Sequence, residues 1–124
     1  MILHEELSGA IIAAAIEVHR AMGAGLSESS YQAMLEHELT LRGIAFRRQV
    51  ELPVVYKGVT LECGYKIDLL VEEKIIVEIK AVESLIGVHE AQLMTYLKLS
   101  GCRVGLLINF NVELLKNGII RRVI

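Results

Sequence analysis

The sequence predicts an α/β fold in which a central mixed β-sheet is flanked by α-helices, with the elements in the order α-α-β-β-β-α-β-β. Two segments with helical composition and clear stop signals come first. Three segments rich in Ile, Val and Leu then follow one another closely, as antiparallel strands do. A further helical segment precedes an almost wholly apolar fourth strand. We therefore expect the third and fourth strands to pair in parallel through a right-handed crossover.

The length of 124 residues allows one hydrophobic core but not two, so we expect residues 1–124 to form a single domain. Apolar residues make up 53% of the chain, and the mean hydropathy of +0.48 is high for so short a chain. One hypothesis is a homo-oligomer that buries part of this apolar surface. No apolar run approaches the ~20 residues that span a bilayer, and the acidic start lacks the basic region of a signal peptide. No membrane partner is expected.

The net charge of −2 excludes a generally basic surface, which counts modestly against a DNA substrate. A local basic patch is still compatible with the sequence. Cys63 and Cys102 lack CxxC spacing and are interpreted as small buried hydrophobic residues in a reducing cytoplasm. The candidates for the basic patch are Arg47, Arg48, Lys57, Arg103, Arg121 and Arg122.

The first two segments are predicted helices. Ser8 is expected to cap a helix over residues 9–22, and Ser27 a second helix over 28–42. At 100° per residue, Glu28 lies in the middle of the apolar stripe of the second helix, which predicts an inward-facing carboxylate. The alternative is an acid that the helix dipole favours in the first turn. In the first helix, His19 is interpreted as a partly buried helix residue rather than a ligand.

The remaining segments alternate between strands and one helix. Pro53 in the first strand suggests an edge position or a bulge, and Gly64 in the second suggests a bulge or a close backbone approach. His89, Gln92 and Tyr96 fall on one face of the later helix, which could be a polar flank. The predicted strands cover residues 49–56, 59–71, 74–81, 103–110 and 119–124, and the helix covers 88–99.

The hairpin from Gly64 to Val82 organises the chain. Its apolar and charged residues alternate, so each strand is expected to have one apolar face and one face that carries charge. Leu70 and Ile76 fall on the charged face, so that face is expected to be partly covered. The odd positions hold Ile67, Leu69, Val71, Ile75, Val77 and Ile79, and the even positions hold Lys66, Asp68, Glu78 and Lys80.

The three-residue loop 72–74 places both apolar faces on one side of the sheet and sets Asp68 opposite Glu78. Opposed side chains have Cβ atoms about 5 Å apart, so two carboxylates repel unless a cation lies between them. Lys80 projects from the same face. This grouping is typical of a divalent metal site with an adjacent ammonium. The alternative is a solvent-facing strand with mixed charges.

These residues resemble a known family. Asp68 followed by Glu78-Ile79-Lys80 resembles the D…(D/E)-x-K core of the PD-(D/E)XK nuclease superfamily, although Ile67 stands where those proteins often have Pro. Gly25-Leu-Ser-Glu28-Ser-Ser-Tyr31 resembles the GxxExxY signature of small bacterial and archaeal proteins placed in that superfamily. Gln92-x-x-x-Tyr96 is similar to the Q-x-x-x-Y motif of RecB-like and lambda-exonuclease-like members. The resemblance covers the chain from about Ser8 to its end.

The resemblance implies a restriction-endonuclease-like core and a nuclease that hydrolyses phosphodiester bonds, most simply in DNA. Asp68, Glu78 and the backbone carbonyl of Ile79 would bind Mg²⁺ or Mn²⁺, and Glu28 would join directly or through water. Lys80 would orient or deprotonate the attacking water, or stabilise the transition state. Gln92 and Tyr96 would contact DNA phosphate or position the water.

Two alternatives stay open. The first is a nuclease-fold binding or assembly module with little or no catalytic turnover, which the small size and slight acidity favour. The second is a small-molecule phosphodiesterase or another metal hydrolase that uses the same carboxylates.

Overall fold

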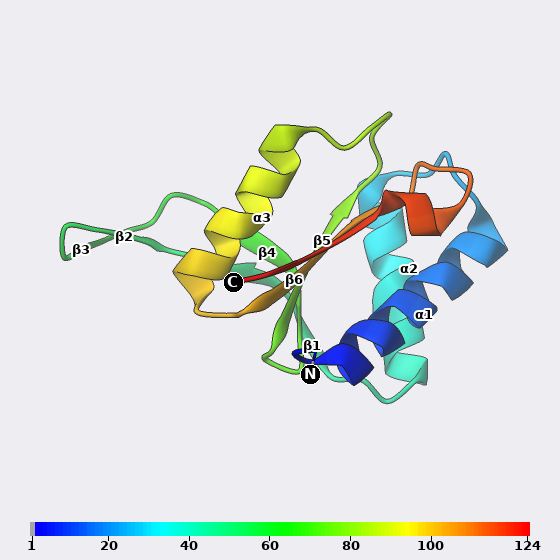
Figure 1. The fold of residues 1–124 in the computed structure, drawn as a ribbon, viewed down its shortest axis with the longest axis horizontal. Helices are drawn as coiled ribbons and strands as arrows, with labels where there is room; N and C mark the ends of the chain where they lie inside the picture. The colour runs from blue at the N-terminus through cyan, green and yellow to red at the C-terminus, as the bar shows by residue number, and fades with distance from the viewer. Residues whose placement is uncertain (1) are drawn as a thin grey trace.

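The computed structural model describes residues 2–124 (Figure 1). Two helices come first, a third lies between the two parallel strands, and a short 3₁₀ helix precedes the last strand. The elements are α1 (Glu5–Met22), α2 (Glu28–Leu41), β1 (Phe46–Glu51), β2 (Val54–Tyr56), β3 (Val59–Leu61), β4 (Lys66–Val71), β5 (Ile75–Lys80), α3 (Gly87–Ser100), β6 (Val104–Asn109), η1 (Leu115–Gly118) and β7 (Ile119–Val123).

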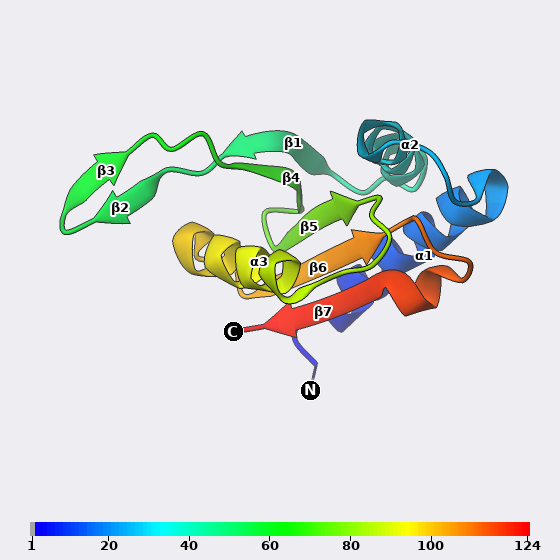
Figure 2. The ribbon, with the colours of Figure 1, turned by 90° about the horizontal axis from the view of Figure 1, so that it is seen from above.

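The central sheet has five strands in the order β1-β4-β5-β6-β7 (Figure 2). β5 and β6 are parallel, and the other neighbours are antiparallel. The mixed sheet with flanking helices confirms the predicted fold class, and it is consistent with a restriction-endonuclease-like core. The parallel pairing through α3 is also confirmed. β6 is buried along its whole length, as its apolar sequence predicts.

Helices cover both faces of the sheet (Figure 1). α1 and α2 contribute Ile11, Tyr31 and Leu35 to a core cluster with alternate residues of β5 and β6. On the opposite face, α3 contributes Leu93 and Leu97 to a second cluster. The predicted charged face of the hairpin therefore lies beneath α3.

The first two predicted strands are each broken in two. β1 pairs with β4, whereas β2 pairs only with β3 and forms a two-stranded arm that projects from the body (Figures 1 and 2). Pro53 has no N–H to continue the β1 ladder, and Gly64 adopts a φ of +78°, which bends the returning strand. The main-chain N–H of Leu52 donates to the carbonyl of Tyr65 at the base of the arm.

The expected cap at Ser8 is wrong. α1 begins at Glu5, with His4 at the N-cap, and Ser8 lies buried inside the helix. Glu5 and Glu6 in the first turn favour the earlier start because the helix dipole attracts negative charge there. Ser8 instead accepts a hydrogen bond from the Nε of Arg121 at 3.3 Å.

The other helix ends agree with the sequence. Ser27 caps α2, because its Oγ accepts a hydrogen bond from the main-chain N–H of Ser30 at 3.2 Å. Gly43 follows the end of α2 with a φ of +70°, and Gly101 ends α3 in the left-handed conformation.

β4 changes faces at Asp68. Leu69 packs in the cluster beneath α1 and α2, but Ile67, two residues earlier, packs in the cluster beneath α3. The expectation that these residues share a face is therefore wrong. The change coincides with an irregularity in β1: Gln49 has a left-handed φ of 47° and lies level with Asp68 in the strand register.

The same change occurs in β1 on either side of Gln49. Phe46 packs against the cluster beneath α1 and α2, whereas Val50 packs against the cluster beneath α3. In a regular strand these two residues would face the same side. Both strands therefore change faces at the level of Asp68.

Within residues 2–124, no helix has the length and apolar character needed to cross a membrane.

Gly105 of β6 fixes how closely α3 approaches the sheet. A β-carbon at this position would lie 2.7 Å from Cδ1 of Leu93, a fully buried residue of α3. We expect Gly105→Ala to lower the free energy of unfolding by about 1–3 kcal/mol, because an overpacked core must shift. Urea denaturation measures this. Gly9→Ala is the control, since its β-carbon meets no atom within 4 Å in α1; wild-type stability of Gly105→Ala would contradict the packing argument.

Candidate functional site

Asp68 and Glu78 lie where the β4–β5 ladder ends. The paired residues are Leu69–Val77, Leu70–Ile76 and Val71–Ile75, which is the predicted register. Beyond this point the side-chain carboxylates, in place of main-chain carbonyls, accept hydrogen bonds from the opposite strand. The N–H of Asp68 donates to Oε2 of Glu78 at 2.8 Å, and the N–H of Ile79 donates to Oδ2 of Asp68 at 2.8 Å. Each carboxylate is thus held by the backbone of the opposite strand.

The two carboxylates are shielded from water. Glu78 is only 4% exposed, and Asp68, the single aspartate of the chain, is half-buried. The neighbouring Leu70 and Ile76 are buried beneath α3. The alternative of a solvent-facing strand with mixed charges is therefore wrong for this part of the hairpin.

Burial changes the acidity of both groups. Burial and, after it, the negative charge of Asp68 raise the pKa of Glu78 to about 8. The pKa of Asp68 is also raised, mainly by burial, although hydrogen bonds from the Ile79 main chain and Gln49 oppose the shift. A proton or a cation between the carboxylates would relieve this electrostatic cost.

Lys80 connects the hairpin to α3. Its Nζ donates to Oε1 of Gln92 at 3.4 Å, and Nε2 of Gln92 donates to the hydroxyl of Tyr96 at 3.3 Å. Burial raises the pKa of the Tyr96 hydroxyl, and the charges of Glu78 and Asp68 raise it as well. The structure therefore brings together Asp68, Glu78, Lys80, Gln92 and Tyr96.

Within the described part of the chain, Glu28 is not close enough to Asp68 and Glu78 to form a three-carboxylate metal group with them. Tyr31, Leu35 and Leu39 of α2 are fully buried, as the apolar stripe predicts, but Glu28 in the first turn is exposed. Its negative charge still contributes to the raised pKa values of Asp68 and Glu78.

Tyr31, the last residue of the Gly25-to-Tyr31 motif, has a structural role. Its hydroxyl donates to the carbonyl of Gly23 at 2.5 Å and accepts from the N–H of Leu26 at 3.2 Å. Its ring stacks on Phe110 with centroids 4.6 Å apart. These contacts fix the loop that presents the first turn of α2.

The two histidines singled out in the sequence form local contacts. Nδ1 of His89 accepts from the N–H of Ile86 at the start of α3. Nε2 of His19 lies 2.8 Å from the carbonyl of Val112.

The cysteines are both free. Cys102 is half-buried, but Cys63 is exposed in the segment between β3 and β4, so the expectation of a buried Cys63 is wrong.

Most residues of the candidate basic patch already contact carboxylates or main-chain carbonyls of the protein itself. Arg47 pairs with Glu73 at 2.8 Å, and Arg48 pairs with Glu36 at 3.1 Å. Arg122 pairs with Glu90. Arg103 and Arg121 donate to main-chain carbonyls, and Lys57 lies 5.4 Å from the ring centroid of Tyr56.

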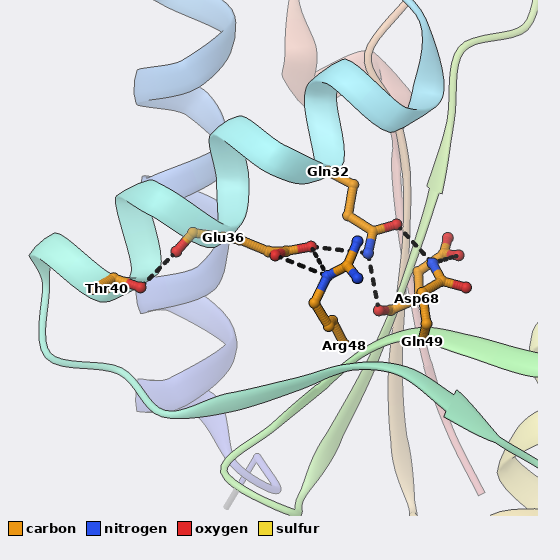
Figure 3. Close-up of polar contacts among 6 residues, drawn as sticks. All are labelled: Gln32, Glu36, Thr40, Arg48, Gln49 and Asp68. Atoms are coloured by element: carbon orange, nitrogen blue, oxygen red, sulfur yellow. Dashed lines mark hydrogen bonds and ion pairs between the residues drawn. The ribbon is translucent and has the colours of Figure 1, made fainter.

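Two glutamines of the site were not identified from the sequence. Nε2 of Gln49 donates to Oδ1 of Asp68 at 3.3 Å and to Oε1 of Gln32 at 2.9 Å. Nε2 of Gln32 donates to the main-chain carbonyl of Asp68 at 3.3 Å (Figure 3). One signal was available: Gln32 directly follows Tyr31 on the buried stripe of α2, where a polar residue needs a partner. The backbone conformation of Gln49 has no comparable sequence signal.

The donor set fits a hard divalent cation. Among residues 2–124, no three His, Cys, Asp or Glu side chains are grouped to hold a metal, so the carboxylates form a pair. The N–H of Ile79 faces Asp68, and the N–H and carbonyl of one strand residue point to the same side. The Ile79 carbonyl therefore points to the β4 side of β5, on which Asp68 lies. Carboxylate and carbonyl oxygens suit Mg²⁺ or Mn²⁺.

A family model described as the PD-(D/E)XK nuclease superfamily matches residues 5–123, nearly the whole chain. No match was found among curated proteins or among solved structures.

The raised pKa of Glu78 predicts how the stability of the metal-free protein depends on pH. The pKa is about 8 in the folded state against an ordinary value of 4.5, so between these pH values the folded state holds a proton that the unfolded state releases. This contribution to stability is complete below pH 4.5 and is lost as the pH rises through 8. Glu78→Gln should remove that loss and be more stable than wild type above pH 8, on the order of a few kcal/mol.

Urea denaturation in EDTA between pH 4.5 and 9 measures this effect. Glu62→Gln, at an exposed carboxylate outside the site, should retain the wild-type pH dependence. A Glu78→Gln variant with the same pH dependence as wild type would show that Glu78 does not titrate with a raised pKa.

Proposed function

Because this chain belongs to the PD-(D/E)XK nuclease superfamily, we propose that it is a nuclease that hydrolyses phosphodiester bonds in DNA and depends on Mg²⁺ or Mn²⁺. The observation that carries the proposal is the buried Asp68–Glu78 pair with Lys80 beside it. A purely structural domain gains nothing from two shielded carboxylates that repel each other.

The proposed metal ligands are Asp68, Glu78 and the carbonyl of Ile79, with Glu28 contributing through water. A bound divalent cation lowers the pKa of a coordinated water and offsets the charge of the scissile phosphate. The two hydrogen bonds from the main chain hold the carboxylates in place before any cation arrives. Binding therefore requires little rearrangement of the strands.

Lys80 would orient the attacking water or, as the neutral amine, help deprotonate it; as an ammonium it would instead stabilise the negative charge of the transition state. Gln92 restrains the Lys80 ammonium through its side-chain oxygen. Tyr96 is held in turn by Gln92, so its hydroxyl is placed to donate to a phosphate oxygen. These three residues form the side of the site that would contact the substrate.

A second candidate function is a binding or assembly module with little turnover. It is favoured by the net charge of −2 and by the engagement of Arg47, Arg48 and Arg122 with carboxylates. Few arginines then remain for phosphate contacts, which supply most nonspecific affinity for nucleic acid. Metal binding without cleavage would favour this function.

The homo-oligomer stays a prediction, and the β2–β3 arm supports it. Val55, Tyr56 and Val59 are each more than half exposed on this arm, and an isolated two-stranded hairpin is marginally stable in water. A second chain would bury these side chains. Two free cysteines without a disulfide fit a reducing cytoplasm.

Two substitutions test the site. Asp68→Asn and Lys80→Ala should each abolish cleavage of plasmid and single-stranded DNA in Mn²⁺ while the circular dichroism spectrum is unchanged. Asp68→Asn should also abolish Mn²⁺ binding in calorimetry, because it removes a charged ligand. Lys74→Ala is the matched control: it removes an exposed lysine in the turn before β5. Cleavage by either site variant at the wild-type rate would refute the site.

The same pair predicts an effect on the metal-free protein. In EDTA, Asp68→Asn should raise the melting temperature, because the substitution removes the repulsion between Asp68 and Glu78 while an oxygen remains to accept from Ile79. Differential scanning calorimetry at pH 9 gives the clearest comparison. A lower melting temperature would show that the contacts of the Asp68 carboxylate outweigh the repulsion.

A further inference from the structure

Gln49 has an unusual backbone conformation for its position. Five non-glycine residues among residues 2–124 have a positive φ, and four of them lie at a helix start or in a turn: His4, Lys57, Glu72 and Glu73. Gln49 alone of the five lies inside a strand. Such conformations are costly for a residue with a β-carbon and persist where the surrounding structure requires them.

The side-chain contacts of Gln49 indicate why this backbone conformation is retained. Its Nε2 donates to Oδ1 of Asp68 at 3.3 Å and to Oε1 of Gln32 at 2.9 Å. The other carboxylate oxygen of Asp68 accepts from the N–H of Ile79. Asp68 therefore has a donor on each oxygen, one from β5 and one from the Gln49 side chain.

Gln32 ties this contact to α2. It is 6% exposed, and its Nε2 donates both to the Asp68 carbonyl at 3.3 Å and to Oε2 of Glu36 at 2.9 Å. Glu36 is in turn paired with Arg48, the residue before Gln49 (Figure 3). The contacts thus run from α2 to Asp68 and return to β1.

We propose that Gln49, supported by Gln32, is a positioning residue that fixes the orientation of the Asp68 carboxylate. Its consequence for catalysis rests on the proposed nuclease function, because Asp68 is there a metal ligand. Glycine would adopt the observed φ without strain, so the change of strand faces does not by itself call for a glutamine. The contact with Asp68 does require a glutamine side chain here, since its amide is the group that reaches Asp68.

Two substitutions separate this role from a structural one. Gln49→Gly removes both the amide and the backbone strain, whereas Gln49→Met removes the amide, retains the side-chain length and retains the strain. Gln49→Met should therefore be less stable than Gln49→Gly. Both should disturb Asp68 to a similar extent. Lys57→Gly is the control, because it relieves a φ of 49° in the turn of the distant arm.

The first readout needs no metal. Amide hydrogen exchange, followed by NMR in EDTA, should be faster at Ile79 in both Gln49 variants, because the Ile79 N–H donates to Asp68. The amide of Val77, which lies in the regular β4–β5 ladder, should keep its wild-type rate, as should Ile79 in Lys57→Gly. Unchanged exchange at Ile79 in both Gln49 variants would overturn the positioning role.

The second readout is Mn²⁺ affinity by calorimetry. Residues that orient a metal ligand typically change affinity by 10–100-fold when replaced, so both Gln49 variants should bind Mn²⁺ about tenfold more weakly and Lys57→Gly should bind as wild type does. Wild-type affinity in Gln49→Gly, or weakening only in Gln49→Met in step with its stability, would overturn the proposal. If wild type binds no Mn²⁺, the proposed function fails, and the exchange at Ile79 still decides the positioning role.

Discussion

The site depends on the cost of holding two carboxylates together away from water. Asp68 and Glu78 face each other where the sheet is covered, and burial raises the pKa of both. Main-chain N–H groups of the opposite strand hold each carboxylate, so the strands give up ladder pairing at this point in exchange for side-chain hydrogen bonds. The fold therefore maintains a pair that favours a cation.

The rest of the structure places groups around this pair from both faces of the sheet. α3 closes one side and brings Gln92 and Tyr96 to Lys80. Its distance from the sheet is set by Gly105, which leaves room for Leu93. The parallel pairing of β5 and β6 requires a crossover, and α3 is that crossover. The α3 connection thus allows the parallel pairing and also supplies side chains to the site.

On the α2 side of the sheet, the groups that contact Asp68 are neutral amides. The first turn of α2 carries Glu28 into solvent, and on this side Asp68 is contacted instead by Gln32 of α2 and Gln49 of β1. The left-handed conformation of Gln49 lets β1 and β4 change faces together, so that Asp68 is reached from α2 while its charge remains beside Tyr96. Strained backbone at such a position fits the tendency of functional sites to store strain.

The sequence by itself determined the register that sets Asp68 opposite Glu78, because strand alternation and an odd-length loop leave one pairing that buries the apolar faces. It likewise determined the crossover and the face that carries Gln92. The tertiary structure decided that Glu28 is exposed and that Gln49 reaches Asp68. Periodicity specifies the faces of an element while its conformation is regular, but how far a helix end extends, and where a strand leaves regular geometry, depend on contacts with residues distant in the chain.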